Sequence, residues 1–430
     1  MEARLHSLDE IFALAAAHDF YRERLSGIKH FSQAPITDKS LLYELVTAKL
    51  SQEGETQALY LSPTGGSIAN QLLFFPTAIK ENTFQRSVLA PYLNAAGMFK
   101  GAVAINLFGS NMMYRSMEIF NYFLEAADAT TLPFSSGCDD AAILALSKHF
   151  RADTLMGMPS RLMQFAQHVR TETSDSDRLK LKHIVYAGES LSEQKRDYLF
   201  EIFGATKFSA IFGSAEAGIW AYRPYSLNQE GYLYPLEIMH VEVLDPDAQG
   251  FGRLVLTNLI RCRNPLLRYD CGDRGKISTI NYQGKMMGLL EFSGRAANSF
   301  QIGGNYFDIS ELSEITAPLL DFQIELSYDR DKHKDRLLFL AVHEQADKPG
   351  AAQETDKKRP KSDEEKPDRD REGQDRDNEK QDRARESLAE RLMNILQSNG
   401  DFLVSVDLVT MKDLTRSRTS GKVIKVLDKR

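Results

Sequence analysis

The stretch "HIVYAGESLSEQKRDYLFEIFGATKFSAIFG", residues 183–213, places a helical pattern between two short apolar runs. An apolar run, a helix and a second apolar run in this order favour two parallel strands joined by a crossover helix. The same alternation reaches back to residue 101, through "GAVAINLF", "SMEIFNYFLEAA", "DATTLPF", "AAILALSKHF", "TLMGM" and "RLMQFAQHV". Residues 101–213 therefore predict an α/β fold with a mostly parallel sheet and flanking helices.

The segments on either side of this stretch have other patterns. Residues 1–50 carry apolar residues at helical spacing and predict a helical start. Residues 219–295 carry apolar runs joined by Gly, Pro, Asn and Asp, which predicts a β-rich part with separate strands at "PLLRYD" and "GKISTI". Two strands, a helix and another strand follow. We therefore expect a large domain over residues 1–295 and a small α+β domain over 296–430.

One segment of the small domain, residues 345–386, has almost no apolar residue and mixes both signs of charge. Such a segment cannot bury enough surface to offset the entropy of ordering, so it predicts a disordered insertion. A single charged helix is the alternative, although prolines and glycines argue against it in the first half of the segment.

The composition excludes several classes of protein. The chain has 430 residues, a net charge of −7 and three cysteines, Cys138, Cys262 and Cys271, which form no metal-like pair and no disulfide framework. No apolar run is long enough to span a membrane, and the N-terminal "MEARLHSLDEIF" has acids where a signal peptide is apolar. Since there is also no broad basic face, we expect a cytoplasmic protein with no nucleic-acid or membrane partner.

A hydroxyl-glycine stretch, "LSPTGGSIANQ" at residues 61–71, lies between two apolar runs. Main-chain N–H groups of a glycine-rich turn can surround an anion, and Ser and Thr hydroxyls add donors. The candidate donors here are Ser62, Thr64, Gly65, Gly66 and Ser67. The alternative is a plain turn between two strands.

Two carboxylates and two basic residues stand in turns that could serve a nucleotide. Glu216 follows the strand at 207–213, where one carboxylate can hold Mg²⁺ beside phosphates; a helix N-terminal glutamate is the alternative. Asp273 follows "PLLRYD", where a carboxylate can accept hydrogen bonds from ribose hydroxyls; an Asp–Arg turn is the alternative. Arg295 and Lys422 lie near glycine turns, and Lys422 can be presented there to a phosphate or carboxylate.

These segments, taken in order, resemble the adenylate-forming superfamily of acyl-CoA synthetases, and within it the phenylacetate–coenzyme A ligase branch. The resemblance covers nearly the whole chain apart from the charged insertion. The stretches that carry it are "FYRERL", "APITDKSLL", "LSPTGGSIAN", "VYAGESLSEQKRDYLFEIFG", "IFGSAEAG", "GRLVLTNL", "PLLRYDCGD", "SGRAANSFQIGGNYFDISELSEI" and "RTSGKVIKVLDKR".

The resemblance implies an enzyme that makes an acyl adenylate from a carboxylic acid and ATP with Mg²⁺, and then passes the acyl group to a thiol. The catalytic residues would be Lys422, which polarises the carboxylate and the α-phosphate, and Glu216, which holds Mg²⁺. The small domain would be mobile and would rotate between the two half-reactions. The implied ATP- and AMP-binding residues are Ser62, Thr64, Gly65, Gly66 and Ser67 for the phosphates, Gly188, Glu189, Phe212, Gly213 and Ser214 near the adenine and α-phosphate, and Asp273 and Arg295 for the ribose.

The chain departs from the family pattern at several positions: Pro63 and Gly65 in the loop, Ala69 or Asn70 at its closing lysine, Ala210 near adenine, Ala215 near the α-phosphate and Ala297 in the hinge. Each lost contact costs about 1–3 kcal/mol where the site is buried. Because Glu216, Asp273, Arg295 and Lys422 are retained, a working enzyme is favoured. A catalytically idle nucleotide binder is the alternative.

The acid pocket would be built from aromatic side chains, with Phe108, Tyr114, Tyr186 and Trp220 as candidates; core packing is the alternative for each. The branch prefers aromatic acids, and the chain resembles the small adenylating enzymes of antibiotic pathways. Coenzyme A is the expected acceptor. A carrier protein, a reductase or another acyl-accepting protein is the alternative acceptor, and the charged insertion could then serve as a docking tether.

Overall fold

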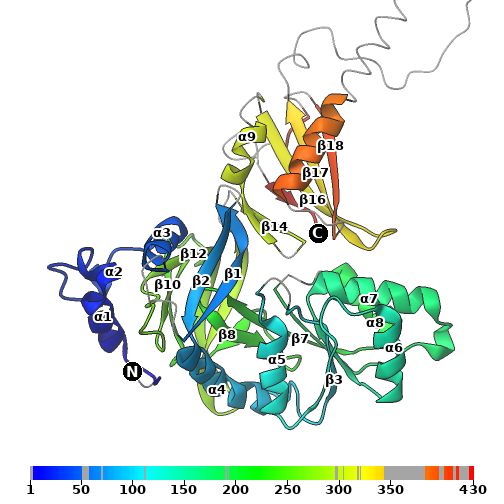
Figure 1. Cartoon of the computed structure of the whole chain (residues 1–430), viewed down its shortest axis with the longest axis horizontal. Helices are drawn as coiled ribbons and strands as arrows, with labels where there is room; N and C mark the ends of the chain where they lie inside the picture. Colours follow the sequence, from blue (N-terminus) through cyan, green and yellow to red (C-terminus); the bar gives the residue numbers. More distant parts are fainter. Residues whose placement is uncertain are drawn as a thin grey trace, which may run out of the picture. The chain divides into compact units, whose positions relative to one another are not determined.

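The structure, a computed structural model, describes residues 3–50, 58–68, 71–110, 113–188, 191, 193–295, 299–303, 305–316, 319, 321–342, 383–396, 401–409, 413–415 and 426–430. The chain divides into two compact units, Met1–Ala296 and Ala297–Arg430 (Figure 1). Most of the predicted insertion, residues 345–382, lies outside the described residues. Its last part, residues 383–386, is helical.

The first unit is built on an eleven-stranded sheet in the order β10-β11-β12-β13-β9-β8-β7-β6-β5-β3-β4. Its parallel part consists of β3 (Val103–Asn106), β4 (Thr130–Pro133), β5 (Thr154–Gly157), β6 (His183–Ala187) and β7 (Lys207–Ser214). The helices α5 (Ser116–Glu125), α6 (Asp140–His149), α7 (Pro159–Glu172) and α8 (Glu193–Phe203) connect these strands. The predicted α/β fold with a parallel sheet and flanking helices is confirmed.

The remaining strands of this sheet are antiparallel and form its β-rich part. They are β8 (Gly218–Arg223), β9 (Tyr232–Tyr234), β10 (Met239–Leu244), β11 (Gly252–Asn258), β12 (Tyr269–Tyr282) and β13 (Lys285–Arg295). The prediction of two strands at "PLLRYD" and "GKISTI" is wrong. One strand, β12, runs through "DCGD", because β11 and β13 both pair with it. Its register with β11 shifts between Arg253 and Val255, and its register with β13 shifts between Arg274 and Gly275.

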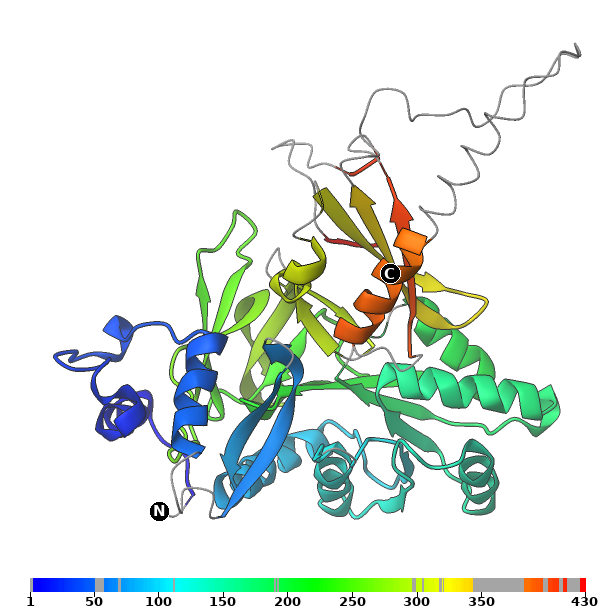
Figure 2. The ribbon, with the colours of Figure 1, turned by 45° about the horizontal axis from the view of Figure 1, so that its top comes forward.

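The hydroxyl-glycine stretch belongs to a separate hairpin of β1 (Leu59–Ile68) and β2 (Gln71–Ala78), which Figure 2 shows in blue. Strand β1 runs through "SPTGGSI", and its register with β2 shifts between Pro63 and Ser67. The expectation of a loop over Ser62 to Ser67 is therefore wrong for the main chain, which is an irregular strand. Helix α4 (Ile79–Ala95) follows β2 directly.

The N-terminal residues form α1 (Leu8–Ala17), α2 (Asp19–Arg22), the 3-10 turn Phe31–Gln33 and α3 (Lys39–Leu50), so the helical start is confirmed. Ser7 and Glu10 form a reciprocal capping box that fixes the beginning of α1. The Asp38 carboxylate accepts a hydrogen bond from the Leu41 N–H at 2.8 Å, which caps α3. Among the described helices, none has the length and apolar character that crossing a bilayer requires.

The second unit contains the hairpin β14 (Ser299–Ile302) and β15 (Asn305–Asp308), the 3-10 turn Ile309–Leu312 and the short α9 (Ser313–Thr316). Its four-stranded sheet has the order β18-β17-β16-β19, with β16 (Asp321–Asp329), β17 (Lys334–Val342), β18 (Leu403–Leu408) and β19 (Val426–Asp428). The described residues 383–395 form a helix whose Leu388, Leu392 and Leu396 side is buried against the sheet. The predicted small α+β architecture is confirmed.

Candidate active site

The parallel strands end together at one edge of the sheet. Going outward from β3, the chain places β4 on one side and β5, β6 and β7 on the other, and ligands of open α/β sheets bind beyond the carboxyl ends of such strands. Gly188 follows β6 with a φ of +85°. Because Ala187 pairs with Ile211, Gly188 lies next to Phe212 of β7 at this edge.

Phe212 lies in a group of four aromatic side chains. Its ring centroid is 4.6 Å from that of Phe292, 5.6 Å from that of Trp220 and 5.7 Å from that of Tyr232. Phe212 is half-buried, and the next two residues, Gly213 and Ser214, are exposed. A large aromatic face is therefore held firmly at the edge where the main chain becomes accessible.

The two residues predicted for ribose, Asp273 and Arg295, are cross-strand partners on β12 and β13. Phe292, three residues before Arg295, carries the aromatic contact to Phe212. Asp273 is 9% exposed and lies within a strand rather than a turn, so the Asp–Arg turn alternative is wrong. The Arg295 side chain lies outside what the structure describes.

Glu216 lies in the turn that joins β7 to β8, so the helix N-terminal alternative is wrong. The side chain is 5% exposed, and its Oε1 accepts a hydrogen bond from the Tyr43 hydroxyl at 2.7 Å. A buried carboxylate requires such a donor, because removing an unpartnered charge from water is costly. The partner comes from α3, more than a hundred residues away in the sequence.

The main chain of this turn is held by three buried polar side chains. The Arg261 guanidinium donates to the Glu216 carbonyl, and Gln85 Nε2 donates to the Ala217 and Ile219 carbonyls, each at 2.9 Å. Asn258 Nδ2 donates to the Ala217 carbonyl at 3.1 Å and to Gln85 Oε1 at 3.0 Å. These bonds leave the turn little freedom to change its shape.

Arg261 carries a fully buried charge. Burial lowers the pKa of its guanidinium to about 10, although the Glu81 and Glu216 carboxylates act in the opposite direction. The side chain is therefore still cationic at neutral pH. Glu81 Oε1 accepts from the Cys262 and Arg263 N–H groups at 3.0 Å each, and burial raises the pKa of this carboxyl.

The sequence analysis missed all five of these supporting residues: Tyr43, Glu81, Gln85, Asn258 and Arg261. The available signal was on α4, where Glu81 and Gln85 are one helical turn apart and both buried. Periodicity assigns such polar positions to the solvent side of a helix. Here they face a polar turn, which only the tertiary structure reveals.

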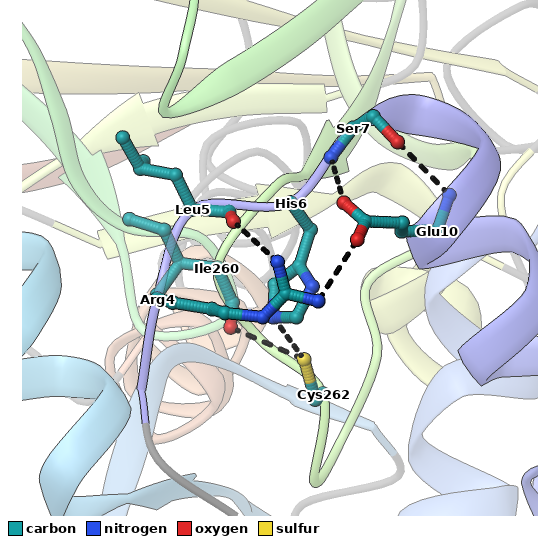
Figure 3. Close-up of polar contacts among 7 residues, drawn as sticks. All are labelled: Arg4, Leu5, His6, Ser7, Glu10, Ile260 and Cys262. Carbon is teal, nitrogen blue, oxygen red and sulfur yellow. Dashed lines mark hydrogen bonds and ion pairs between the residues drawn. The ribbon is translucent and has the colours of Figure 1, made fainter.

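Residues near the beginning of the chain also contact the segment 259–263, and Figure 3 shows those around Cys262. The His6 N–H donates to the Leu259 carbonyl at 3.0 Å. Cys262 Sγ lies 3.0 Å from His6 Nε2. Arg4 pairs with Glu10 at 2.8 Å beside this contact. Burial, followed by Arg4, lowers the pKa of His6, so its imidazole is neutral and its ring nitrogen can accept from the thiol.

The hairpin that carries Thr64, Gly65, Gly66 and Ser67 is joined to the same segment, because Asn264 Nδ2 donates to the Pro76 carbonyl of β2 at 3.1 Å. The side chains of those four residues lie outside what is described, while Ser62 is half-buried. The irregular part of β1, between Pro63 and Ser67, is where its main-chain N–H groups leave regular pairing with β2.

The four candidates for the acid pocket lie in different surroundings. Phe108 is 2% exposed and stacks on Phe120 with ring centroids 3.8 Å apart, and Trp220 is 1% exposed, so both are in the main core. Tyr186, on β6 between Gly157 and Ala210, is half-buried, and burial raises the pKa of its hydroxyl. Tyr114 is 39% exposed.

Lys422, Glu189 and Ala297 lie outside the described residues. The described residues on either side of Lys422 are both attached to β16. Gln323 exchanges two hydrogen bonds of 3.1 Å with the Thr415 main chain, and Val426 pairs with Ile324.

No protein-family model matches the chain. A phenylacetate–coenzyme A ligase from Pseudomonas putida is 23% identical over 343 residues, which cover 73% of this chain and 77% of that enzyme. A 2-hydroxyisobutyryl-CoA ligase, solved with 2-HIB-AMP and CoA in the thioesterification state, superimposes with a TM-score of 0.69 at 18% identity. That match covers 98% of this chain and 88% of the ligase. The chain has the fold of this acyl-CoA ligase.

Its sequence relative is a phenylacetate–coenzyme A ligase, which agrees with the branch expected from the motifs. An open form of the 2-hydroxyisobutyryl-CoA ligase gives a lower TM-score of 0.59 over the same 98% of this chain. The superfamily fold therefore accounts for both units.

Proposed function

We propose that this protein activates a carboxylic acid with ATP and transfers the acyl group to a thiol, as an AMP-forming acid–CoA ligase. The observation that carries the proposal is the Phe212–Phe292 contact. It brings the strand end before Glu216 beside the paired Asp273 and Arg295. We assign the aromatic face of Phe212 to adenine, and Asp273 with its cross-strand partner Arg295 to the ribose.

The magnesium ion implied by the superfamily fits the residues present. Among the described residues, no three His, Cys, Asp or Glu side chains lie together as a metal site. Those residues therefore form no metal site built wholly from protein ligands. Glu216 offers a single carboxylate, which is how Mg²⁺ is commonly held when phosphate oxygens and waters complete its shell. When bound, the ion would neutralise charge on the phosphates.

The protein's own residues would position the reactants. A carboxylate oxygen of the acid attacks the α-phosphorus and pyrophosphate leaves, giving the acyl adenylate. The thiol sulfur then attacks the acyl carbon, AMP leaves and the thiol proton passes to solvent. We assign to Lys422 the stabilisation of negative charge on the acid and the α-phosphate in the first step, and to β1 main-chain groups the β- and γ-phosphates.

For the acid we propose an aromatic one, supported by the half-buried Tyr186 at the end of β6 and by the aromatic group around Phe212. For the thiol we propose coenzyme A, the cosubstrate that the names of both relatives imply. A carrier protein or a reductase remains the alternative acceptor, in a biosynthetic setting such as antibiotic assembly.

The test is pyrophosphate release with a panel of aromatic and aliphatic acids, followed by mass spectrometry of the products with and without coenzyme A. We expect release with an aromatic acid and a free thioester when coenzyme A is added. Lys422→Ala should reduce adenylation by about 10²-fold or more, the usual effect of removing a charge-stabilising group. ATP binding without release for any acid would instead identify an idle nucleotide binder.

A further inference from the structure

The hydrogen bond between Tyr43 and Glu216 joins two regions that the proposed reaction uses. Tyr43 is 2% exposed, and its hydroxyl donates to Oε1 of the Glu216 carboxylate at 2.7 Å. In the part of the chain that the structure describes, no other side chain donates to this carboxylate. The hydroxyl therefore fixes the direction of the carboxylate while the second oxygen stays available to a cation.

Helix α3, which carries Tyr43, is itself attached to the strand of Asp273. The Thr37 N–H donates to the Arg268 carbonyl and the Asp270 N–H donates to the Thr37 carbonyl, both at 2.9 Å. Leu42 and Val46, on either side of Tyr43, are buried in the main core. The tyrosine thus projects from a helix that is anchored three residues before Asp273.

We propose that Tyr43 is a positioning residue for metal binding: it orients the Glu216 carboxylate toward a divalent cation held with ATP, while Arg261 fixes the main chain of the same turn. The inference rests on the proposed adenylation function and extends it to residues that no motif marks. Groups that orient a metal ligand commonly change metal affinity or activity by about 10–100-fold when removed.

A purely structural role for Tyr43 is the competing explanation, and the chain supplies a matched control for it. Tyr21 is 1% exposed, lies in the same unit, and donates through its hydroxyl to the Pro265 carbonyl at 3.2 Å. Tyr21→Phe removes a buried hydroxyl as Tyr43→Phe does, but one that donates to a main-chain carbonyl and not to Glu216. The two variants should lose comparable thermal stability, so a difference in metal dependence cannot come from unfolding.

The first readout is the free Mg²⁺ concentration that gives half-maximal pyrophosphate release at saturating acid and ATP. We expect Tyr43→Phe to raise it about tenfold, with excess Mg²⁺ restoring most of the rate and the KM for the acid unchanged. Tyr21→Phe should leave the Mg²⁺ requirement as in the wild type. Equal Mg²⁺ requirements in the two variants would overturn the proposal.

The second readout does not depend on catalysis. Binding of Mn²⁺ to the full-length protein with a non-hydrolysable ATP analogue is followed by the loss of the free Mn²⁺ electron paramagnetic resonance signal. We expect Tyr43→Phe to bind Mn²⁺ about tenfold more weakly than the wild type, and Tyr21→Phe to bind it with the wild-type affinity. If the wild type binds Mn²⁺ in this way but adenylates no acid, the proposed function fails, and the Mn²⁺ affinities of Tyr43→Phe and Tyr21→Phe alone decide the positioning role. If it binds no Mn²⁺ with the analogue, the positioning role itself fails.

Arg261→Lys tests the same idea should Tyr43→Phe fold poorly. Lysine keeps the buried charge but cannot reproduce the guanidinium geometry at the Glu216 carbonyl. The control is Arg268→Lys, since Arg268 also donates to main-chain carbonyls, those of Ser32 and Ala34. We expect weaker Mn²⁺ binding for Arg261→Lys than for Arg268→Lys. Equal Mn²⁺ affinity in these two variants would contradict the proposal.

Discussion

Gly218, the first residue of β8, is a glycine that the Glu216 turn requires. Its φ is +72°, and a Cβ atom there would lie 2.7 Å from Arg261 Nη2 and 2.8 Å from Gln85 Nε2. Gly218→Ala would therefore both strain the main chain and displace the two side chains that hold the turn. We expect it to lower the free energy of unfolding by about 2–4 kcal/mol.

Gly27 separates these two effects. It has a similar φ of +78°, but a Cβ atom at this position would have no neighbour within 4 Å, so Gly27→Ala should cost only the main-chain part, about 1 kcal/mol. Urea unfolding followed by the fluorescence of Trp220, the single tryptophan, measures both variants in the first unit. Equal losses would show that the contacts of Gly218 contribute nothing.

The Cys262 thiol is expected to be unreactive despite its contact with His6. Burial and then the Glu81 carboxylate raise the pKa of this thiol to about 12, and a neutral imidazole does not stabilise the thiolate. Compared with an ordinary thiol of pKa about 8.5, the thiolate fraction at neutral pH is smaller by about 10³-fold. Alkylation with iodoacetamide, followed by peptide mass spectrometry, should therefore label Cys262 far more slowly than free glutathione.

At the scale of single elements, the parallel strands were predictable and the site-bearing antiparallel ones were less so. Strands such as β6 and β7 are covered on both faces, so they appear in the sequence as short apolar runs between amphipathic helices. Strand β12 contains "DCGD" and β1 contains "SPTGGS", whose residues are typical of turns. Pairing with neighbouring strands decides their conformation, and a single sequence does not contain that information.

The same reason explains which parts of the candidate site were accessible to sequence reasoning. Glu216 and Asp273 could be proposed from their place after apolar runs and from the family motifs. Tyr43 and Arg261 could not, because the contacts with Glu216 connect residues far apart in the sequence. The motifs suggest groups that could meet a ligand, whereas packing decides which side chains contact those groups.

A buried histidine, His183, where β6 pairs with β7, leads us to predict that the stability of the protein depends on pH. His183 pairs with Lys207 across the parallel ladder, and its Nε2 lies 2.8 Å from Ser209 Oγ. Burial and then Lys207 lower the pKa of His183 to about 4, from 6.5. Between pH 6.5 and pH 4, His183 is therefore protonated in the unfolded chain but neutral in the native state. The free energy of unfolding falls as the pH is lowered through this range.

Between pH 7 and pH 5 this one group should cost about 2 kcal/mol of the free energy of unfolding. His183→Gln keeps a polar partner for Ser209 but does not titrate. It should be less stable than the wild type at pH 7, and the gap should narrow at pH 5. Urea unfolding followed by Trp220 fluorescence at both pH values is the measurement; a constant gap would mean that His183 is not the responsible group.

At the scale of the whole molecule, the two units have separate apolar cores. The main core of the first unit draws on residues from Leu42 to Leu290, and that of the second on residues from Phe300 to Val406. A unit with its own core can in principle fold alone. The proposed catalytic groups are also divided, since Glu216 and Asp273 belong to the first unit and Lys422 to the second.

Residues 1–296 produced alone should therefore fold, bind nucleotide and fail to adenylate. Trp220 and its buried neighbours lie wholly within this fragment, so its fluorescence transition in urea should be cooperative and its midpoint close to that of the full chain. ATP with Mg²⁺ should raise the melting temperature of the fragment, because a ligand that binds only the native state stabilises it. Pyrophosphate release should fall to background, since the fragment lacks Lys422.

Adding a fragment of residues 297–430 tests whether the loss of pyrophosphate release comes from the missing lysine. We expect partial recovery of the release with the wild-type fragment and no recovery with its Lys422→Ala variant. Full adenylation by residues 1–296 alone would contradict the assignment of Lys422 to the first half-reaction.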